Sequence, residues 1–176
     1  MAGSEVGPLT RFLARRRVAL GLLVTLAAAA LADPTWGSWG VGLLIALCGE
    51  ALRVWAAGHL EKGREVTQSG PYRLTAHPLY VGTTVMAAGI VVACRSLPLG
   101  VLAAAYLGGT ILAAVRTEEA FLRQSFGDAY DAYRRAPAPV GRRFSFARAR
   151  RNREHRAVVG LLGGFALLAL KIVLEI

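Results

Sequence analysis

Two polar segments hold the residues whose types and spacing could do chemistry. In the first, Ser69–Tyr80, Gly70-Pro71 predicts a turn and His77-Pro78 predicts the start of a helix. The N–H groups of a first helical turn favour an anionic group of a ligand. Tyr72, His77 and Tyr80 offer hydrogen bonds and flat surfaces for a base. The alternative interpretation is an ordinary helix start with aromatic residues at a membrane interface.

The second segment begins with Arg116-Thr117-Glu118-Glu119. Two adjacent carboxylates cannot share one helix face, so this pair does not indicate a hydrolase with two facing acids. One carboxylate could bind ribose hydroxyls or an ammonium group while the other pairs with Arg116 or Arg123. The alternative is a solvated, charged turn.

Other ionisable residues have more structural interpretations. Glu50 and Arg53 are three residues apart within an apolar block, which predicts a structural pair or an arginine that reaches the membrane surface. His59 is expected at the surface, and His155 has no evident partner. Cys48 and Cys94 have no metal-ligand spacing and are expected to be buried and unpaired.

Several chemistries lack their motifs. The chain has no P-loop, glycine-rich dinucleotide fingerprint, HExxH motif, cysteine-rich metal motif or serine nucleophile elbow. The three histidines are too scattered to predict a metal site.

The elements that position these segments are apolar helices. The chain has 176 residues, of which 55% are hydrophobic, and a mean hydropathy of +0.45. We predict an all-α, polytopic membrane bundle of about five spans and one amphipathic helix. The amphipathic helix is predicted over Arg116–Tyr133, because apolar side chains recur there every four residues, at Leu122, Phe126 and Tyr130. The predicted spans are Val18–Ala32, Trp39–Gly58, His77–Ala93, Leu99–Val115 and Ala157–Val173.

These spans form one membrane domain with three parts. Residues 1–58 hold two spans, residues 59–133 the core with a helical hairpin, and residues 134–176 an Arg-rich interfacial segment and the last span. The hairpin would pack closely through Ala87, Ala88 and Gly89 against Gly108 and Gly109.

Loop charges predict the orientation. Arginine and lysine concentrate before the first span and in the loops that hold the two polar segments, which places the N-terminus and the site in the cytoplasm. We expect an integral, multi-pass protein of the cell membrane, with the first span retained rather than cleaved as a signal peptide. Nine arginines within Arg134–Arg156 favour anionic lipid headgroups as partners rather than nucleic acid.

Taken together, the motifs resemble the isoprenylcysteine carboxyl methyltransferase family, which is related to the phospholipid methyltransferases. The resemblance covers about Arg53–Tyr133. It depends on the order Gly-Pro-Tyr-Arg, His-Pro-Leu-Tyr-Val-Gly, an apolar hairpin, Arg-Thr-Glu-Glu and Phe-Gly-Asp-Ala-Tyr-Asp-Ala-Tyr.

The resemblance implies a membrane methyltransferase that uses S-adenosylmethionine, with a lipid-like or prenylated acceptor entering from the bilayer. It implies that Arg116 orients the acceptor and that Glu118 and His77 take part in catalysis. The implied cofactor-binding residues are Val66, Thr67, Tyr72, His77, Pro78, Leu79, Tyr80, Glu118 and Glu119.

The sequence departs from the family where Ala76 precedes His77, because the family commonly has arginine there. Arg73 is the candidate replacement. A carboxylate acceptor needs no base, whereas an amine would need His77, Glu118 or Glu119 to remove a proton. The lack of an obvious base favours a carboxylate or thiolate. A sterol-type membrane reductase that uses NADPH and a non-enzymatic lipid-binding adaptor are the alternatives.

Overall fold

The described part of the chain is an all-helical bundle. A computed structural model describes residues 16, 23, 27–28, 30–135 and 141–175, which contain helices and no strand. Among these residues, α2 (Trp36–Ala57), α4 (Leu97–Phe126) and α7 (Glu154–Leu174) are long and apolar enough to cross a membrane. The apolar helix α3 (Pro78–Cys94) is shorter, at 17 residues.

The predicted helical membrane architecture is therefore supported, but the count of five spans is not. Four predicted spans correspond to α2, α3, α4 and α7. Most of the first predicted span, Val18–Ala32, lies outside the described residues, so that span stays a prediction.

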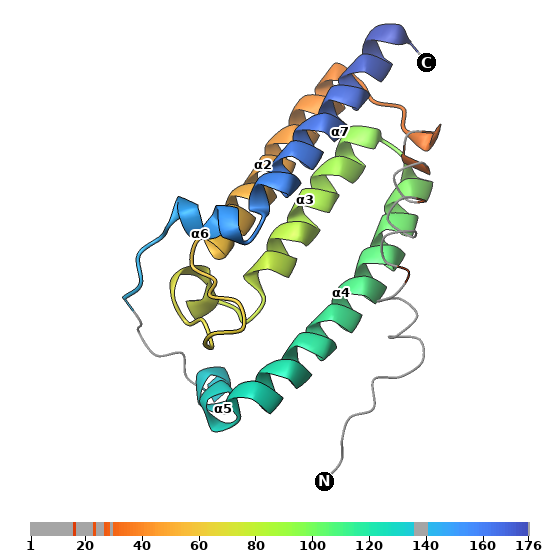
Figure 1. Ribbon diagram of the computed structural model, residues 1–176. Helices are drawn as coiled ribbons and strands as arrows, with labels where there is room; N and C mark the ends of the chain where they lie inside the picture. Colours follow the sequence, from red (N-terminus) through yellow and green to blue (C-terminus); the bar gives the residue numbers. More distant parts are fainter. Residues whose placement is uncertain (1–15, 17–22, 24–26, 29, 136–140, 176) are drawn as a thin grey trace.

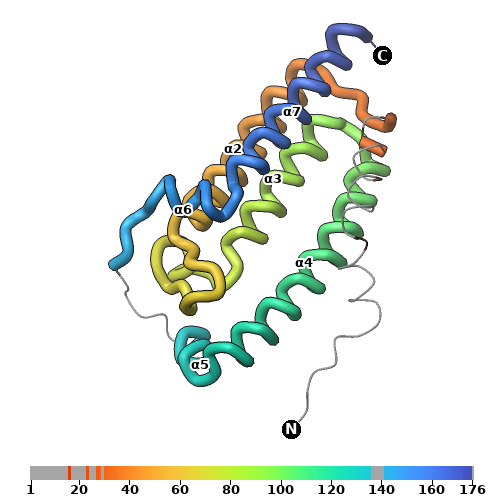
Figure 2. The backbone as a smooth tube through the Cα atoms, in the orientation of Figure 1, coloured from red at the N-terminus to blue at the C-terminus, as the bar shows by residue number. Residues whose placement is uncertain are grey.

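Helices α2, α3 and α7 lie side by side, whereas α4 diverges from α3 along its length (Figures 1 and 2). The tight pair is α2 with α3, because glycines let their backbones approach. A Cβ on Gly42 would lie 2.5 Å from the carbonyl oxygen of Gly89, and one on Gly82 would lie 2.7 Å from that of Gly49. The predicted packing of Gly89 against Gly108 is wrong, because a Cβ on Gly108 would meet nothing within 4 Å. Residue periodicity does not tell which neighbour a glycine face meets.

Adding a side chain at this contact should separate the helices. A Cβ at residue 49 would lie 2.6 Å from the carbonyl oxygen of Gly82, so Gly49→Val should destabilise the protein by about 1–3 kcal/mol or more. Gly40→Val is the matched control on the same helix, since a Cβ there meets nothing within 4 Å. Thermal unfolding of both variants in detergent checks this, and equal melting temperatures would contradict the packing.

Helix α4 is longer than a bilayer requires. It has 30 residues, whereas crossing the hydrocarbon core takes about 20, so its last turns extend beyond the apolar part. It ends at Phe126 because Gly127 adopts φ 45°, and α5 (Asp128–Arg135) follows in a new direction (Figure 1). The predicted single amphipathic helix over Arg116–Tyr133 is thus two helices joined at Gly127.

A charged cluster joins three helices inside the bundle. Arg53 of α2 pairs with Glu50 at 3.4 Å and with Glu154 of α7 at 2.7 Å. It also donates a hydrogen bond to the Thr83 hydroxyl of α3. The structural pair of Glu50 and Arg53 is confirmed, and Glu154 is an additional partner that local spacing could not reveal.

Candidate functional site

A cavity of about 500 Å³ lies between α3 and α4 at the end of the bundle where α4 has diverged. Three smaller pieces close it: the loop from Leu60 to Thr67, the short helix η1 (Gly70–Arg73), and α5. Its described lining comprises Leu60, Glu61, Lys62, Gly63, Glu65, Val66, Thr67, Tyr72, Ala76, His77, Pro78, Leu79, Tyr80, Thr110, Ala113, Ala114, Thr117, Glu118, Phe121, Leu122, Tyr130 and Tyr133.

This cavity brings together the two polar segments singled out in the sequence. All nine predicted cofactor-binding residues line it except Glu119, which lies immediately behind His77. Arg116 is exposed and is not part of the lining, so the structure does not bring this predicted acceptor-orienting residue to the site. Successive helical residues turn by about 100°, so Arg116 and Glu118 point to opposite sides of α4.

His77 connects the two segments. It precedes α3 as the N-cap residue, and Pro78 occupies the first helical turn as predicted. Its Nε2 lies 3.3 Å from Glu119 Oε1, and its Nδ1 lies 3.9 Å from Glu118 Oε2. Glu119 also approaches Arg123 and Arg134, at 3.8 and 3.9 Å. The imidazole is thus held between a carboxylate of the lining and a carboxylate behind it.

Tyrosines supply hydroxyl groups at the opposite wall. The Tyr133 hydroxyl donates a hydrogen bond to the carbonyl oxygen of Tyr72 at 2.7 Å, which ties α5 to η1. The hydroxyls of Tyr72 and Tyr130 are buried and have no hydrogen-bond partner among the described residues. Burial raises the pKa of Tyr72, and it raises the pKa of Tyr133 to about 12. Both phenols therefore stay protonated at neutral pH, and Tyr72 can offer its hydrogen to a ligand.

Sequence reasoning missed several lining residues. Tyr130 and Tyr133 belong to the motif Phe-Gly-Asp-Ala-Tyr-Asp-Ala-Tyr, but nothing in the sequence indicated that they line a cavity. Lys62 is the one lysine or arginine among the described lining residues. Ala76 stands where the family commonly has arginine, and it lines the cavity. Arg73, the candidate replacement for that arginine, is exposed and is not part of the lining.

His59 is buried next to the segment that leads into η1. Its predicted exposure at the surface is therefore wrong. Its side chain is buried and its Nδ1 lies 3.0 Å from the Ser69 hydroxyl oxygen. Gly70, at φ 59°, leaves room for the ring, because a Cβ there would lie 2.5 Å from His59 Cδ2. The burying residues include Phe144, whose ring centroid lies 6.2 Å from that of His59 and which is distant in sequence.

Burial of His59 predicts a loss of stability in acid. Desolvation, together with nearby Arg148 and Arg142, lowers the pKa of His59 below its ordinary value of 6.5. The unfolded chain then binds this proton more readily than the folded one, so stability should fall as the pH drops below 6.5. His59→Asn should flatten the dependence of melting temperature on pH, whereas His155→Asn, at an exposed position, should not. Identical pH profiles for wild type and His59→Asn would contradict this.

Comparison with known proteins gives two kinds of match. The sequence model of a family described as "Phospholipid methyltransferase" matches residues 37–129, which is more than half of the chain. The nickel-cobalt-cadmium resistance protein NccN of Alcaligenes xylosoxydans xylosoxydans is 31% identical over 143 residues, covering 74% of this chain and 67% of that protein. The cobalt-zinc-cadmium resistance protein CzcN of Cupriavidus metallidurans is 32% identical over 142 residues, covering 74% of this chain and 66% of that protein.

No solved structure matches the chain. The match of the family model is sufficient to assign membership: the chain belongs to the phospholipid methyltransferase family. The matched region contains α2 without its first residue, α3, α4 and all of the described cavity lining except Tyr130 and Tyr133.

Proposed function

We propose that this member of the phospholipid methyltransferase family transfers a methyl group from S-adenosylmethionine to a lipidic acceptor in the cavity between α3 and α4. One observation carries the proposal: eight of the nine residues that the resemblance assigns to the cofactor come from two distant segments and line a single cavity. Its volume of about 500 Å³ is in the range of small-molecule sites.

The groups of the cavity fit this cofactor. The buried hydroxyls of Tyr72 and Tyr130, which have no hydrogen-bond partner in the described part of the chain, can bind polar atoms of a nucleoside, and Tyr80 offers a ring face. Glu118 supplies a carboxylate for the ammonium group of the cofactor's amino-acid part, which S-adenosylhomocysteine also carries. S-adenosylmethionine would contribute a methyl group that is already electrophilic because it is bonded to a sulfonium. The residues of the chain therefore mainly hold the reactants in line and exclude water.

The apolar acceptor can enter from the side. The lining residues Thr110, Ala113 and Ala114 belong to α4, whose neighbouring Leu112 is exposed along the same apolar helix. We propose that the acceptor's tail stays in the bilayer while its headgroup reaches His77.

The nucleophile determines which residue assists it. For the carboxylate that the sequence favoured, Lys62 replaces Arg116 as the orienting cation, because Lys62 lines the cavity. For an amine, His77 held by Glu119 would take the proton. Alkaline treatment of the labelled product separates the two, since it releases methanol from a methyl ester but leaves an N-methyl group in place.

We propose a multi-pass protein whose site faces the cytoplasm. The segment from residue 141 through α6 (Phe146–Arg151) lies beside the loop that forms one wall of the cavity (Figure 1), and it carries several arginines. Arginine-rich loops remain on the cytoplasmic side, where anionic headgroups attract them. Phe146 is 77% exposed, as suits a side chain that enters the interface.

Metal resistance belongs to the names of the two relatives. Within the described ranges of this chain, no group of three or more His, Cys, Asp or Glu side chains is placed to hold a metal ion.

Ligand-induced stabilisation separates the candidate functions. S-adenosylhomocysteine should raise the melting temperature of the purified protein, whereas NADPH should not. The reverse result would favour a reductase. If neither nucleotide stabilises the protein while deletion of Phe144–Arg156 removes all function, a lipid-binding adaptor is favoured.

A further inference from the structure

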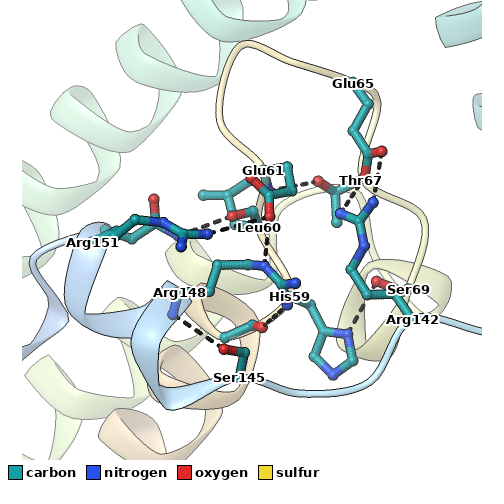
Figure 3. A network of polar contacts seen from close by, with 12 residues as sticks. His59, Leu60, Glu61, Glu65, Thr67, Ser69, Arg142, Ser145, Arg148 and Arg151 are labelled. Atoms are coloured by element: carbon teal, nitrogen blue, oxygen red, sulfur yellow. Dashed lines mark hydrogen bonds and ion pairs between the residues drawn. The ribbon is translucent and has the colours of Figure 1, made fainter.

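A polar network connects the loop wall of the cavity to residues 142–152 (Figure 3). The wall is the loop Leu60–Thr67, which supplies seven lining residues, among them Glu61 and Glu65. The segment opposite is Arg142–Asn152, which lies beyond residues 37–129, the range shared with the family. One side of the network therefore lies within the range that the family model matches, and the other side lies beyond it.

Arg148 makes the closest contacts between the two. Its Nε donates to Glu61 Oε1 at 2.7 Å, and its Nη1 donates to the carbonyl oxygen of Gly58 at 2.6 Å. Both charged side chains are mostly buried, at 15% exposed for Arg148 and 20% for Glu61. The hydrogen bond from Arg148 lowers the pKa of Glu61, which keeps this carboxylate charged at neutral pH.

Other contacts close the same interface along its length. Arg142 pairs with both carboxylate oxygens of Glu65 through its terminal nitrogens Nη1 and Nη2, at 2.5 and 2.8 Å. Asn152 donates to the carbonyl oxygens of Ala57 and Leu60, at 2.8 and 2.9 Å. The contacts with the loop and its base therefore come from the start, the middle and the end of Arg142–Asn152.

The loop has little else to hold it. Within itself, Thr67 Oγ1 accepts a hydrogen bond from the N–H of Glu61 at 3.2 Å, which closes the loop on its own base. Lys62, Gly63 and Arg64 at its tip are exposed, and the loop contains no regular helix or strand. A wall of this kind keeps one shape only if neighbouring structure fixes it.

We propose that Arg142–Asn152 is a clamp that holds the Leu60–Thr67 wall in its ligand-binding position, with Arg148 as the positioning residue acting through Glu61. This inference rests on the proposed function for its ligand, S-adenosylmethionine, but the state of the wall is measurable without any ligand. Arg148 does not line the cavity, so its effect on affinity is indirect.

The affinity arm uses the whole protein in detergent and S-adenosylhomocysteine as the probe. Arg148→Gln should weaken binding about ten-fold, because a charge-assisted contact is lost. Arg148→Lys should retain part of the affinity, since it keeps the charge but cannot reach Glu61 and the Gly58 carbonyl oxygen together. Arg95→Gln, at an exposed arginine beyond the far end of α3, is the matched control and should bind like the wild type.

The coupling arm tests the route through Glu61. If Arg148 acts through this carboxylate, Glu61→Gln with Arg148→Gln should bind no more weakly than Arg148→Gln alone. Losses that multiply in the double variant would overturn the route.

The mobility arm needs no ligand. A nitroxide at Arg64→Cys reports the motion of the loop tip. The background carries Cys48→Ala, because Cys48 is exposed and its predicted burial is wrong, whereas Cys94 is buried as predicted and stays in place. Arg148→Gln should increase nitroxide mobility in the electron paramagnetic resonance spectrum, whereas Arg95→Gln should not. Unchanged mobility in Arg148→Gln would overturn the clamp. If the wild type does not bind S-adenosylhomocysteine, the proposed function fails, and this arm alone then decides the clamp.

Discussion

Glu118→Gln should weaken S-adenosylhomocysteine binding about 10- to 100-fold, since it removes a charged partner worth roughly 1.5–3 kcal/mol. Glu118 lines the cavity, and its Oε2 lies 3.9 Å from His77 Nδ1. Glutamine keeps the shape of the side chain but not its charge, so the fold should be preserved. Calorimetry in detergent measures the change.

Two comparisons sharpen this experiment. Asp128→Asn removes an exposed carboxylate outside the lining and should leave binding unchanged. Tyr80→Ala removes a ring from the lining and should weaken binding as Glu118→Gln does. If both Glu118→Gln and Tyr80→Ala bind like the wild type, the cavity has been assigned to the wrong ligand.

Arg53→Met should lower the free energy of unfolding by about 3–5 kcal/mol, because it leaves two buried carboxylates without their cation. Glu50 and Glu154 are 5% and 6% exposed, and Arg53 contacts both. The same substitution at Arg95, which is 48% exposed and lies 3.9 Å from Asp33, serves as the control and should have a small effect.

A further variant separates the effect of the unpaired charges on stability from the effect of the changed side-chain volume at position 53. Adding Glu50→Gln and Glu154→Gln to Arg53→Met removes the orphaned charges and should recover much of the lost stability. Unfolding monitored by tryptophan fluorescence in detergent compares the variants. Equal stability of Arg53→Met and Arg95→Met would show that the cluster contributes little.

The sequence was sufficient to predict how the two halves of the cavity meet. A short turn between the third and fourth apolar blocks requires the residues before one and after the other to lie at the same end. His77 and Glu119 accordingly lie 3.3 Å apart although 42 residues separate them. Blocks of apolar residues and a proline at a helix start are local signals that a single chain displays directly.

The features that were missed depend on contacts that local patterns do not encode. His59 follows α2 as a surface residue would, but Phe144 and Arg148 return from more than 80 residues away to cover it. The glycines of α3 meet α2 rather than α4, because either neighbour could accept a small-residue face. Gly127 breaks the amphipathic repeat by adopting a positive φ, whereas glycine inside a helix is often tolerated.

The position of Arg116 outside the cavity, in contrast, could have been predicted from helix geometry. Two residues apart on a helix means about 200° of rotation, so Arg116 and Glu118 could not both face the cavity. If Glu118 faces the cavity, Arg116 therefore points away from it. Lys62, which does line the cavity, comes from a loop whose path only the folded chain defines.

Methyl transfer itself tests the central claim most directly. Membrane vesicles that contain the protein are incubated with S-adenosylmethionine carrying an isotopically labelled methyl group, and the lipid extract is analysed by mass spectrometry. We expect a lipid that gains one labelled methyl group with the wild type and little of it with Glu118→Gln. Label absent from all lipids with a protein that binds S-adenosylhomocysteine would contradict a lipidic acceptor, and equal labelling by both proteins would contradict the cavity as the site of transfer.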